Sequence, residues 1–215
     1  MNVRLKRYKK EFNHSYTFGV FPTLELLTHQ PRQTIKVLIH PKGVSNQGIT
    51  KIQTLCQEMS IPTELQERTF ERLGARSNDY AVGIFNNTNT KLGKQKNHVV
   101  LVNPNSMGNL GTIMRTMLGF GFRDLAIIEP AADHFDPKVV RAAMGAIFKL
   151  RISTFPDFEA YRDQQPREYY ALMTNADANI ATIKYRAPYS LIFGNESSGL
   201  SDEFYSLGPA IRIPQ

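Results

Sequence analysis

Short apolar segments alternate with amphipathic ones along the second half of the chain, and this alternation restricts the fold more than any other feature. Continuous apolar runs joined by helices are typical of a parallel sheet that helices cover on both faces. We therefore predict an α/β fold with a parallel sheet over residues 98–215. Strands are expected at 99–102, 125–128, 150–153, 169–173, 191–193 and 211–213, and helices near 109–120, 137–147, 156–164 and 201–206.

The first half shows the same alternation on a smaller scale. Residues 1–85 are predicted to form a small α/β domain, which begins with a basic arm or short helix at 3–11. Residues 86–97 contain one apolar side chain and no periodicity, so nothing in them can nucleate a core, and we predict that they form the interdomain linker. Within the first domain, strands are expected at 35–39, near Ile61 and at 80–85, and helices at 22–27, 47–59 and 65–73.

Positive charge is concentrated in the first half. Residues 1–97 contain 15 Lys and Arg against 7 Asp and Glu, whereas residues 98–215 contain 11 against 12, for a net charge of +7. This asymmetry favours binding to a polyanion, nucleic acid ahead of an anionic membrane surface, with a basic solubilising surface as the alternative.

Several classes of protein can be excluded or are disfavoured. The single Cys56, expected in a core, excludes an internal disulfide and a multi-cysteine zinc site, and the five histidines show no metal-ligand spacing. No apolar run approaches bilayer-spanning length. We expect a soluble, cytoplasmic protein that uses no metal and no membrane.

Residues 103–116 follow one expected strand and open the next helix. Asn109 is placed to cap that helix, and Arg115 stands six residues further on, where a planar cation could hold a phosphate or a carboxylate. A purely structural role remains open for both residues. The helix presents one apolar face, formed by Leu110, Ile113, Met114, Met117 and Leu118.

A second polar loop follows the strand expected at 191–193. Gly194 and Gly199 bound it, and it presents the amide of Asn195 and the carboxylate of Glu196 before Ser201. A strand-to-helix turn with polar caps is the structural alternative. The loop does not fit a hydrolase elbow, because its glycines are too far apart and Glu occupies the nucleophile position.

Three loops are candidates for one shared site, since ligands of parallel sheets bind outside the carboxyl ends of the strands. They are the loops at 103–109, 174–179 and 194–200. A dinucleotide site is disfavoured, because Gly119-Phe120-Gly121 lacks the third glycine of that fingerprint and falls at a helix end.

Together the two polar motifs resemble those of the SpoU/TrmH branch of the knotted SPOUT methyltransferases. Asn109-x-Gly111-x-x-x-Arg115 matches the first motif of that family, and Phe193-Gly194-Asn195-Glu196-x-x-Gly199-Leu200-Ser201 matches the second. Ile211-Arg212-Ile213-Pro214 resembles the beginning of the third motif. Residues 14–85 are similar, more loosely, to the ribosomal-protein-like RNA-binding domain that many members carry.

The resemblance implies a homodimeric enzyme that transfers a methyl group from S-adenosylmethionine to a ribose 2′-hydroxyl of ribosomal or transfer RNA. An α/β-knot domain at 98–215 would carry the site. Arg115 would contact an RNA phosphate and assist activation of the hydroxyl, while Asn109 and Glu196 would orient the reacting groups. Arginine stays protonated, so we favour phosphate-assisted activation over a free base. The cofactor pocket would be lined by Thr174, Asn175, Phe193, Gly194, Asn195, Gly199, Leu200 and Ile213.

The sequence departs from the family at its end. In the family, the third motif continues past the Ile-Pro step into a segment that contains Ser and Asn, and then into a helix. This sequence stops at Gln215. We expect that the third motif and the C-terminal helix are missing because the sequence is incomplete, with a natural truncation as the alternative. The rival function is that of an RNA-binding protein that keeps the fold and no longer methylates.

Overall fold

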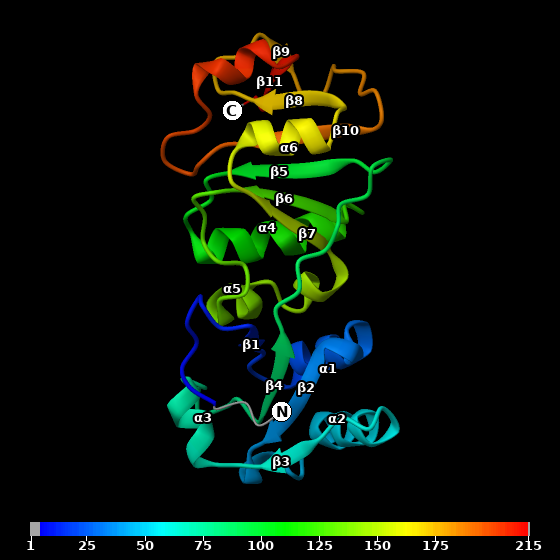
Figure 1. Cartoon of the computed structure of the whole chain (residues 1–215), viewed down its shortest axis with the longest axis vertical. Helices are drawn as coiled ribbons and strands as arrows, with labels where there is room; N and C mark the ends of the chain where they lie inside the picture. Colours follow the sequence, from blue (N-terminus) through cyan, green and yellow to red (C-terminus); the bar gives the residue numbers. More distant parts are fainter. Residues whose placement is uncertain (1–4, 215) are drawn as a thin grey trace. The chain divides into compact units, whose positions relative to one another are not determined.

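The computed structural model describes residues 5–214 and divides into two compact units (Figure 1). Unit 1 contains the chain up to Thr88 together with Met107–Arg115 and Asp133–Lys149. Unit 2 contains Asn89–Ser106, Thr116–Ala132 and the chain from Leu150 onward. The division into a domain at 1–85, a linker at 86–97 and a domain at 98–215 stays a prediction.

Unit 1 contains a four-stranded sheet in the order β1-β4-β2-β3. Strands β2 and β3 pair in parallel, and the other neighbours are antiparallel. Side chains alternate between the two faces of a strand, so Val37 and Ile39 of β2 pack in the core cluster that includes α1 and α2, whereas Leu38 packs in the cluster that includes α3. The elements are β1 (His14–Tyr16), α1 (Val20–His29), β2 (Thr34–Ile39), α2 (Gln47–Glu58), β3 (Thr63–Leu65), α3 (Arg68–Leu73) and β4 (Ala81–Asn86).

Helix α2 shows how local sequence sets an element of unit 1. The side chain of Asn46 accepts a hydrogen bond from the backbone N–H of Gly48, which satisfies one of the free donors of the first turn. Ile49, Ile52 and Cys56 fall at helical spacing and are buried. Burial raises the pKa of the Cys56 thiol to about 11, so this cysteine is a core residue, as expected.

Unit 2 is built on a seven-stranded sheet in the order β7-β6-β5-β10-β8-β11-β9, in which every pair of neighbouring strands is parallel. This confirms the predicted parallel sheet. All five residues of β6 are buried, which explains why the central strands appear as continuous apolar runs. The strands are β5 (His98–Val102), β6 (Asp124–Ile128), β7 (Arg151–Phe155), β8 (Glu168–Leu172), β9 (Ala178–Asn179), β10 (Tyr189–Phe193) and β11 (Ala210–Arg212).

The remaining helices are α4 (Met107–Gly119), α5 (Pro137–Ala142) and α6 (Phe158–Gln164). The helix expected over 137–147 is wrong in its second half. Met144 and Gly145 have φ angles of 47° and 81°, which interrupt the helix before a 3₁₀ turn begins. The segment expected as a helix at 201–206 is likewise a 3₁₀ helix, Asp202–Ser206.

The basic arm at 3–11 contains no helix within its described part, residues 5–11, and residues 3 and 4 lie outside it. Within residues 5–214, no helix combines the length and the apolar content that a membrane crossing requires.

Residues 89–97 of the predicted linker belong to unit 2 and contribute to its core. Leu92 is buried in the core cluster of that unit. Thr90 exchanges hydrogen bonds with Ile152 of β7, and the backbone N–H of Gly93 donates to the carboxylate of Asp124 over 2.7 Å. One apolar side chain and a few backbone contacts leave no periodic pattern, so this contribution to the core could not be predicted from the sequence.

A buried polar network stands where β5 and β10 begin. Nε2 of His98 lies 3.0 Å from the carbonyl oxygen of Gly93 and must donate to it, so Nδ1 accepts from the hydroxyl of Tyr161 over 2.9 Å. That hydroxyl lies 2.6 Å from Oγ of Ser190, which therefore donates to it. Burial lowers the pKa of His98 to about 4 and raises the pKa of Tyr161 to about 12, so both groups are neutral in the folded chain.

This network predicts a loss of stability in mild acid. An unfolded histidine takes up a proton near pH 6.5, whereas folded His98 does so only near pH 4, so its contribution is present above pH 6.5 and is lost as the pH falls to 4. The expected loss in the free energy of unfolding is about 3 kcal/mol. His134 of unit 1 acts in the same direction, since burial also lowers its pKa to about 4.

Urea denaturation followed by circular dichroism between pH 4 and pH 7.5 measures this effect. A His98→Gln variant should be less stable at neutral pH and less sensitive to acid, whereas the exposed His29→Gln serves as the control. An unchanged acid sensitivity in His98→Gln would contradict this assignment.

Candidate functional site

The loop that follows β10 is closed on itself. The backbone N–H of Asn195 donates to the carbonyl oxygen of Gly199 over 3.1 Å, and the N–H of Gly199 donates back over 2.9 Å. A Cβ at Gly194 would lie 2.2 Å from the carbonyl carbon of Gly199 and 2.4 Å from the nitrogen of Leu200. Gly199 has a φ of 68°, which favours glycine. Both glycines of the second motif are therefore required by the shape of the loop.

Asn195 ties this loop to the end of β5. Its side-chain nitrogen donates to the carbonyl oxygen of Asn103 over 2.7 Å, while its oxygen accepts from the backbone N–H groups of Ser197 and Ser198. Asn103 has a φ of 52°, and its own side chain donates to the carbonyl oxygen of Glu129 over 2.8 Å. A chain of amide side chains thus holds together the ends of β5, β6 and β10.

Glu196 makes a second connection between the same loops. Its carboxylate accepts hydrogen bonds from the backbone N–H groups of Asn105 and Ser106, each over 3.2 Å. Hydrogen bonds to a charged acceptor are stronger than neutral ones. The structure therefore confirms that the loops after β5 and β10 lie together.

A pocket of about 490 Å³ opens at the carboxyl ends of β8, β10 and β11. Of the predicted cofactor residues, Thr174, Asn175, Phe193 and Ile213 line it, whereas Gly194, Asn195, Gly199 and Leu200 belong to the adjoining closed loop and are not among its lining residues. Sequence reasoning missed four further lining residues, Leu172, Met173, Arg212 and Pro214.

These missed residues could have been assigned to the pocket only if the order of strands in the sheet had been known. The backbone N–H of Met173 donates to the carbonyl oxygen of Ile211 over 2.9 Å, because β11 pairs in parallel with β8. That pairing brings the ends of the two strands to one pocket. Each missed residue lies within two positions of a predicted one in sequence, but strand order is not readable from a single sequence.

The two remaining predicted residues lie on α4. Asn109 and Arg115 are both exposed there, and they belong to unit 1, whereas the loops and the pocket described above belong to unit 2. Helix α4 begins at Met107, so Asn109 lies inside its first turn and the prediction that it caps the helix is wrong. The predicted apolar face is confirmed by its buried residues Leu110, Met114 and Met117.

Gly111 of the first motif lies where α4 and α5 meet. A Cβ at this position would lie 2.5 Å from Cβ of Ala142 and 2.8 Å from the nitrogen of Ala143. The first motif thus needs a glycine so that the two helices can approach closely. Within residues 5–214, no cluster of three or more His, Cys, Asp or Glu side chains could hold a metal ion.

Comparison with known proteins gives the same assignment as the motifs. A 23S rRNA (uridine(2479)-2′-O)-methyltransferase of Streptomyces viridochromogenes is 31% identical over 117 residues, which cover 51% of this chain and 41% of that protein. A tRNA (cytidine(34)-2′-O)-methyltransferase of Aeromonas hydrophila is 31% identical over 121 residues, which cover 54% of this chain and 77% of that protein. The chain thus spans less than half the length of the Streptomyces relative.

The fold is also shared with solved structures. The crystal structure of the SpoU methyltransferase AviRb from Streptomyces viridochromogenes, in complex with the cofactor AdoMet, superposes with a TM-score of 0.81 at 20% identity. The match covers 94% of this chain and 82% of that chain, and at this identity it shows the fold alone. The model of the SpoU rRNA methylase family matches residues 96–215, which include both polar motifs. The chain therefore belongs to the SpoU rRNA methylase family.

Proposed function

We propose that this chain transfers a methyl group from S-adenosylmethionine to a ribose 2′-hydroxyl of ribosomal or transfer RNA. The observation that carries the proposal is the pocket at the carboxyl ends of β8, β10 and β11, next to a loop that Asn195 and Glu196 fasten to the end of β5. The relatives named above as RNA 2′-O-methyltransferases support it.

The pocket residues fit S-adenosylmethionine. A volume of about 490 Å³ falls in the range of small-molecule sites, and Leu172, Met173 and Phe193 offer apolar surface for a flat base. Thr174 and Arg212 add a hydroxyl and a cation for the polar parts of the molecule. When bound, S-adenosylmethionine supplies a methyl group on a sulfonium centre, which is a good leaving group.

The protein's own residues then have to place the ribose and remove its proton. Arg115 holds an RNA phosphate near the target ribose. The 2′-hydroxyl proton passes by way of an oxygen of that phosphate to water, as the hydroxyl oxygen gains the methyl group and the methyl–sulfur bond breaks to leave S-adenosylhomocysteine. Because arginine stays protonated, Arg115 acts through its charge and its fixed fork of donors. Asn109 and Glu196 orient the reacting groups, which lowers the entropic part of the barrier.

The finer features of the family extend the proposal. Residues 1–85 act as a ribosomal-protein-like RNA-binding domain, 86–97 as a linker and 98–215 as the knotted SPOUT domain. The chain works as a homodimer in the cytoplasm. The basic excess of residues 1–97 supports the RNA-binding role of the first part.

Titration calorimetry with S-adenosylmethionine tests the proposal. We expect one binding site per chain, and we expect Phe193→Ala to weaken binding about tenfold through loss of apolar contact. If the folded chain binds RNA but not S-adenosylmethionine, the rival function of an RNA-binding protein that no longer methylates would replace the proposal.

A further inference from the structure

A second pocket, of about 430 Å³, lies wholly within unit 1 and is here called the basic pocket. Residues from the N-terminal arm, from the end of α3 and from α5 contribute to its wall. Four of its residues are cations, whereas one is a carboxylate. It is lined by Arg7, Tyr8, Phe18, Leu73, Gly74, Arg76, Asp136, Pro137, Lys138, Arg141 and Ala142.

Three of the four cations are not used by the fold. Arg7, Arg76 and Lys138 are exposed, and within residues 5–214 their side chains form no ion pair or hydrogen bond. The backbone N–H groups of Arg76 and Lys138 donate to Asp79 and Asp136, over 2.7 Å and 2.8 Å. These two side chains can therefore change without loss of a contact that shapes the pocket.

The fourth cation is fixed in the wall. Nη2 of Arg141 donates to the carboxylate of Asp79 over 2.7 Å, and its guanidinium lies 5.0 Å from the ring centroid of Phe18. Asp79 is 8% exposed, so its charge is turned into the protein and is balanced by Arg141. Asp79 is thus paired, and the other charges of the lining are the three cations Arg7, Arg76 and Lys138 against the single carboxylate of Asp136.

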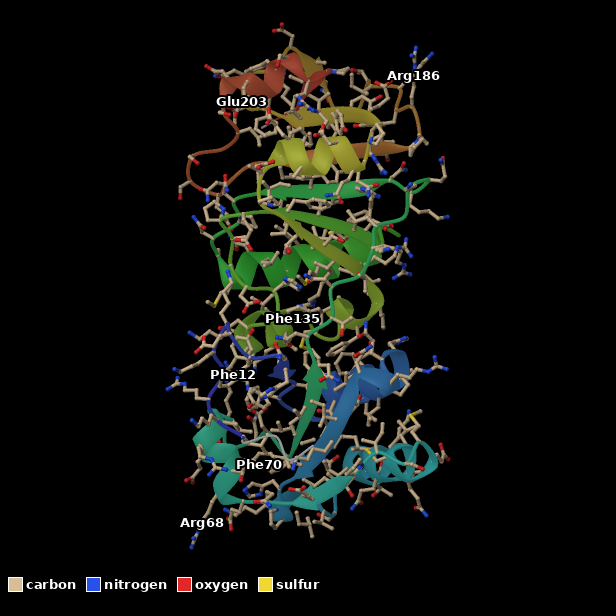
Figure 2. All side chains as sticks on the ribbon, viewed as in Figure 1. Phe12, Arg68, Phe70, Phe135, Arg186 and Glu203 are labelled. Carbon is tan, nitrogen blue, oxygen red and sulfur yellow. The ribbon has the colours of Figure 1, made fainter. Side chains whose placement is uncertain are left out.

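Apolar surface completes the pocket. The ring of Tyr8 is anchored by its hydroxyl, which donates to Asp133 over 2.5 Å, and Leu73 and Pro137 add aliphatic wall. Phe12, labelled in Figure 2, packs edge-on against Tyr8 with ring centroids 6.3 Å apart. A surface that only attracted a polyanion would need no pocket with an apolar wall. The geometry therefore favours a ligand that has both a flat ring system and phosphate groups.

The basic pocket also shares a helix with the first motif. Pro137, Lys138, Arg141 and Ala142 all belong to α5 and line the pocket. Ala142 is also the residue that Gly111 of α4 contacts. Helix α5 therefore links the basic pocket rigidly to the part of α4 that carries the first motif.

We propose that the basic pocket holds one unpaired nucleotide of the substrate RNA. Its base lies against Tyr8, Leu73 and Pro137, and its flanking phosphates pair with Arg7, Arg76 and Lys138. Unpaired bases that are splayed out and held on aromatic surface are the usual basis of sequence-selective RNA recognition. The inference rests on the proposed function, and it makes this pocket a specificity determinant, because α5 fixes its place relative to the first motif.

RNA affinity of the full chain tests the inference. The double variant Arg76→Ala/Lys138→Ala is compared with Lys42→Ala/Lys51→Ala, which removes the same charge from exposed positions of unit 1 outside the pocket. The probe is a fluorescein-labelled single-stranded RNA of about 12 nucleotides, with a duplex of the same length beside it. Thermal melts and S-adenosylmethionine titrations show whether each variant is folded and keeps its cofactor site.

For the single strand, we expect the pocket variant to bind about tenfold more weakly than the control variant. Relative to the wild type, the slope of log affinity against log salt concentration should become less steep by about 1.4. The variant loses two phosphate contacts, and each contact with a single strand contributes about 0.7. Duplex binding should change equally in the two variants.

Equal affinity of the pocket and control variants for the single strand would overturn the inference. It would also be overturned if the pocket variant lost as much affinity for the duplex, relative to the control variant, as it lost for the single strand. Neither result would contradict the proposed function, provided that the variants still bind S-adenosylmethionine. A wild-type chain that binds S-adenosylmethionine but no RNA would overturn both.

Discussion

Replacing Arg115 with alanine is expected to slow methyl transfer by about 10²–10³-fold at saturating S-adenosylmethionine, the usual effect of removing one fixed donor from a developing charge. Arg115 is exposed on α4, whereas the face that supports the helix is formed by the buried Leu110, Met114 and Met117. The variant should therefore fold normally. Its affinity for S-adenosylmethionine should be unchanged, because the pocket at the ends of β8, β10 and β11 does not include this residue.

Two further variants sharpen this test. Arg115→Lys keeps the charge but loses the planar fork of donors, so it should recover only part of the rate. Arg162→Ala removes an equivalent exposed charge from α6 and should transfer methyl groups at the wild-type rate. Single-turnover assays with labelled S-adenosylmethionine measure all three. A wild-type rate in Arg115→Ala would remove this residue from the proposed mechanism.

Replacing Gly194 with alanine is expected to weaken S-adenosylmethionine binding by at least about 100-fold. The added Cβ would stand 2.2 Å from the carbonyl carbon of Gly199, so the loop must open and lose its two backbone hydrogen bonds. Asn195 and Glu196 would then no longer hold the loop against residues 103–106. Both consequences act beside the pocket that we propose for the cofactor, since Gly194 directly follows the lining residue Phe193.

Gly119, a second glycine of this chain, provides the matched control. A Cβ at Gly119, near the end of α4, would meet nothing within 4 Å, so Gly119→Ala should bind S-adenosylmethionine normally and be slightly more stable. Calorimetry measures the affinities, and thermal melts measure the stabilities. If Gly194→Ala bound S-adenosylmethionine as the wild type does, the closed loop would have no part in the cofactor site.

The parts of the molecule that could be predicted are those in which one local pattern decides the structure. The continuous apolar runs of β5 and β6 and the helical spacing of Leu110 and Met114 depend only on neighbours in sequence, and they were placed within one or two residues. The polar loop after β10 could be identified because Gly194 and Gly199 are required by the backbone itself.

The parts that escaped prediction depend on partners far along the chain. Strand β1 is a three-residue element that gains its stability from pairing with β4, and β9 has two residues held by β11. Leu92 shows no pattern of its own but is buried by the core of unit 2. The basic pocket combines Arg7 with Arg76 and Arg141, which only the folded unit 1 brings together.

The position of the methyl group on RNA tests the central claim most directly. The chain is incubated with S-adenosylmethionine labelled in its methyl group and with ribosomal and transfer RNA, and the RNA is then hydrolysed in alkali. Methylation of a 2′-hydroxyl removes the group that attacks the adjacent phosphodiester, so we predict that the label remains in alkali-resistant dinucleotides. Label released in mononucleotides, or no label in either RNA, would contradict the proposal that this chain is an RNA ribose methyltransferase.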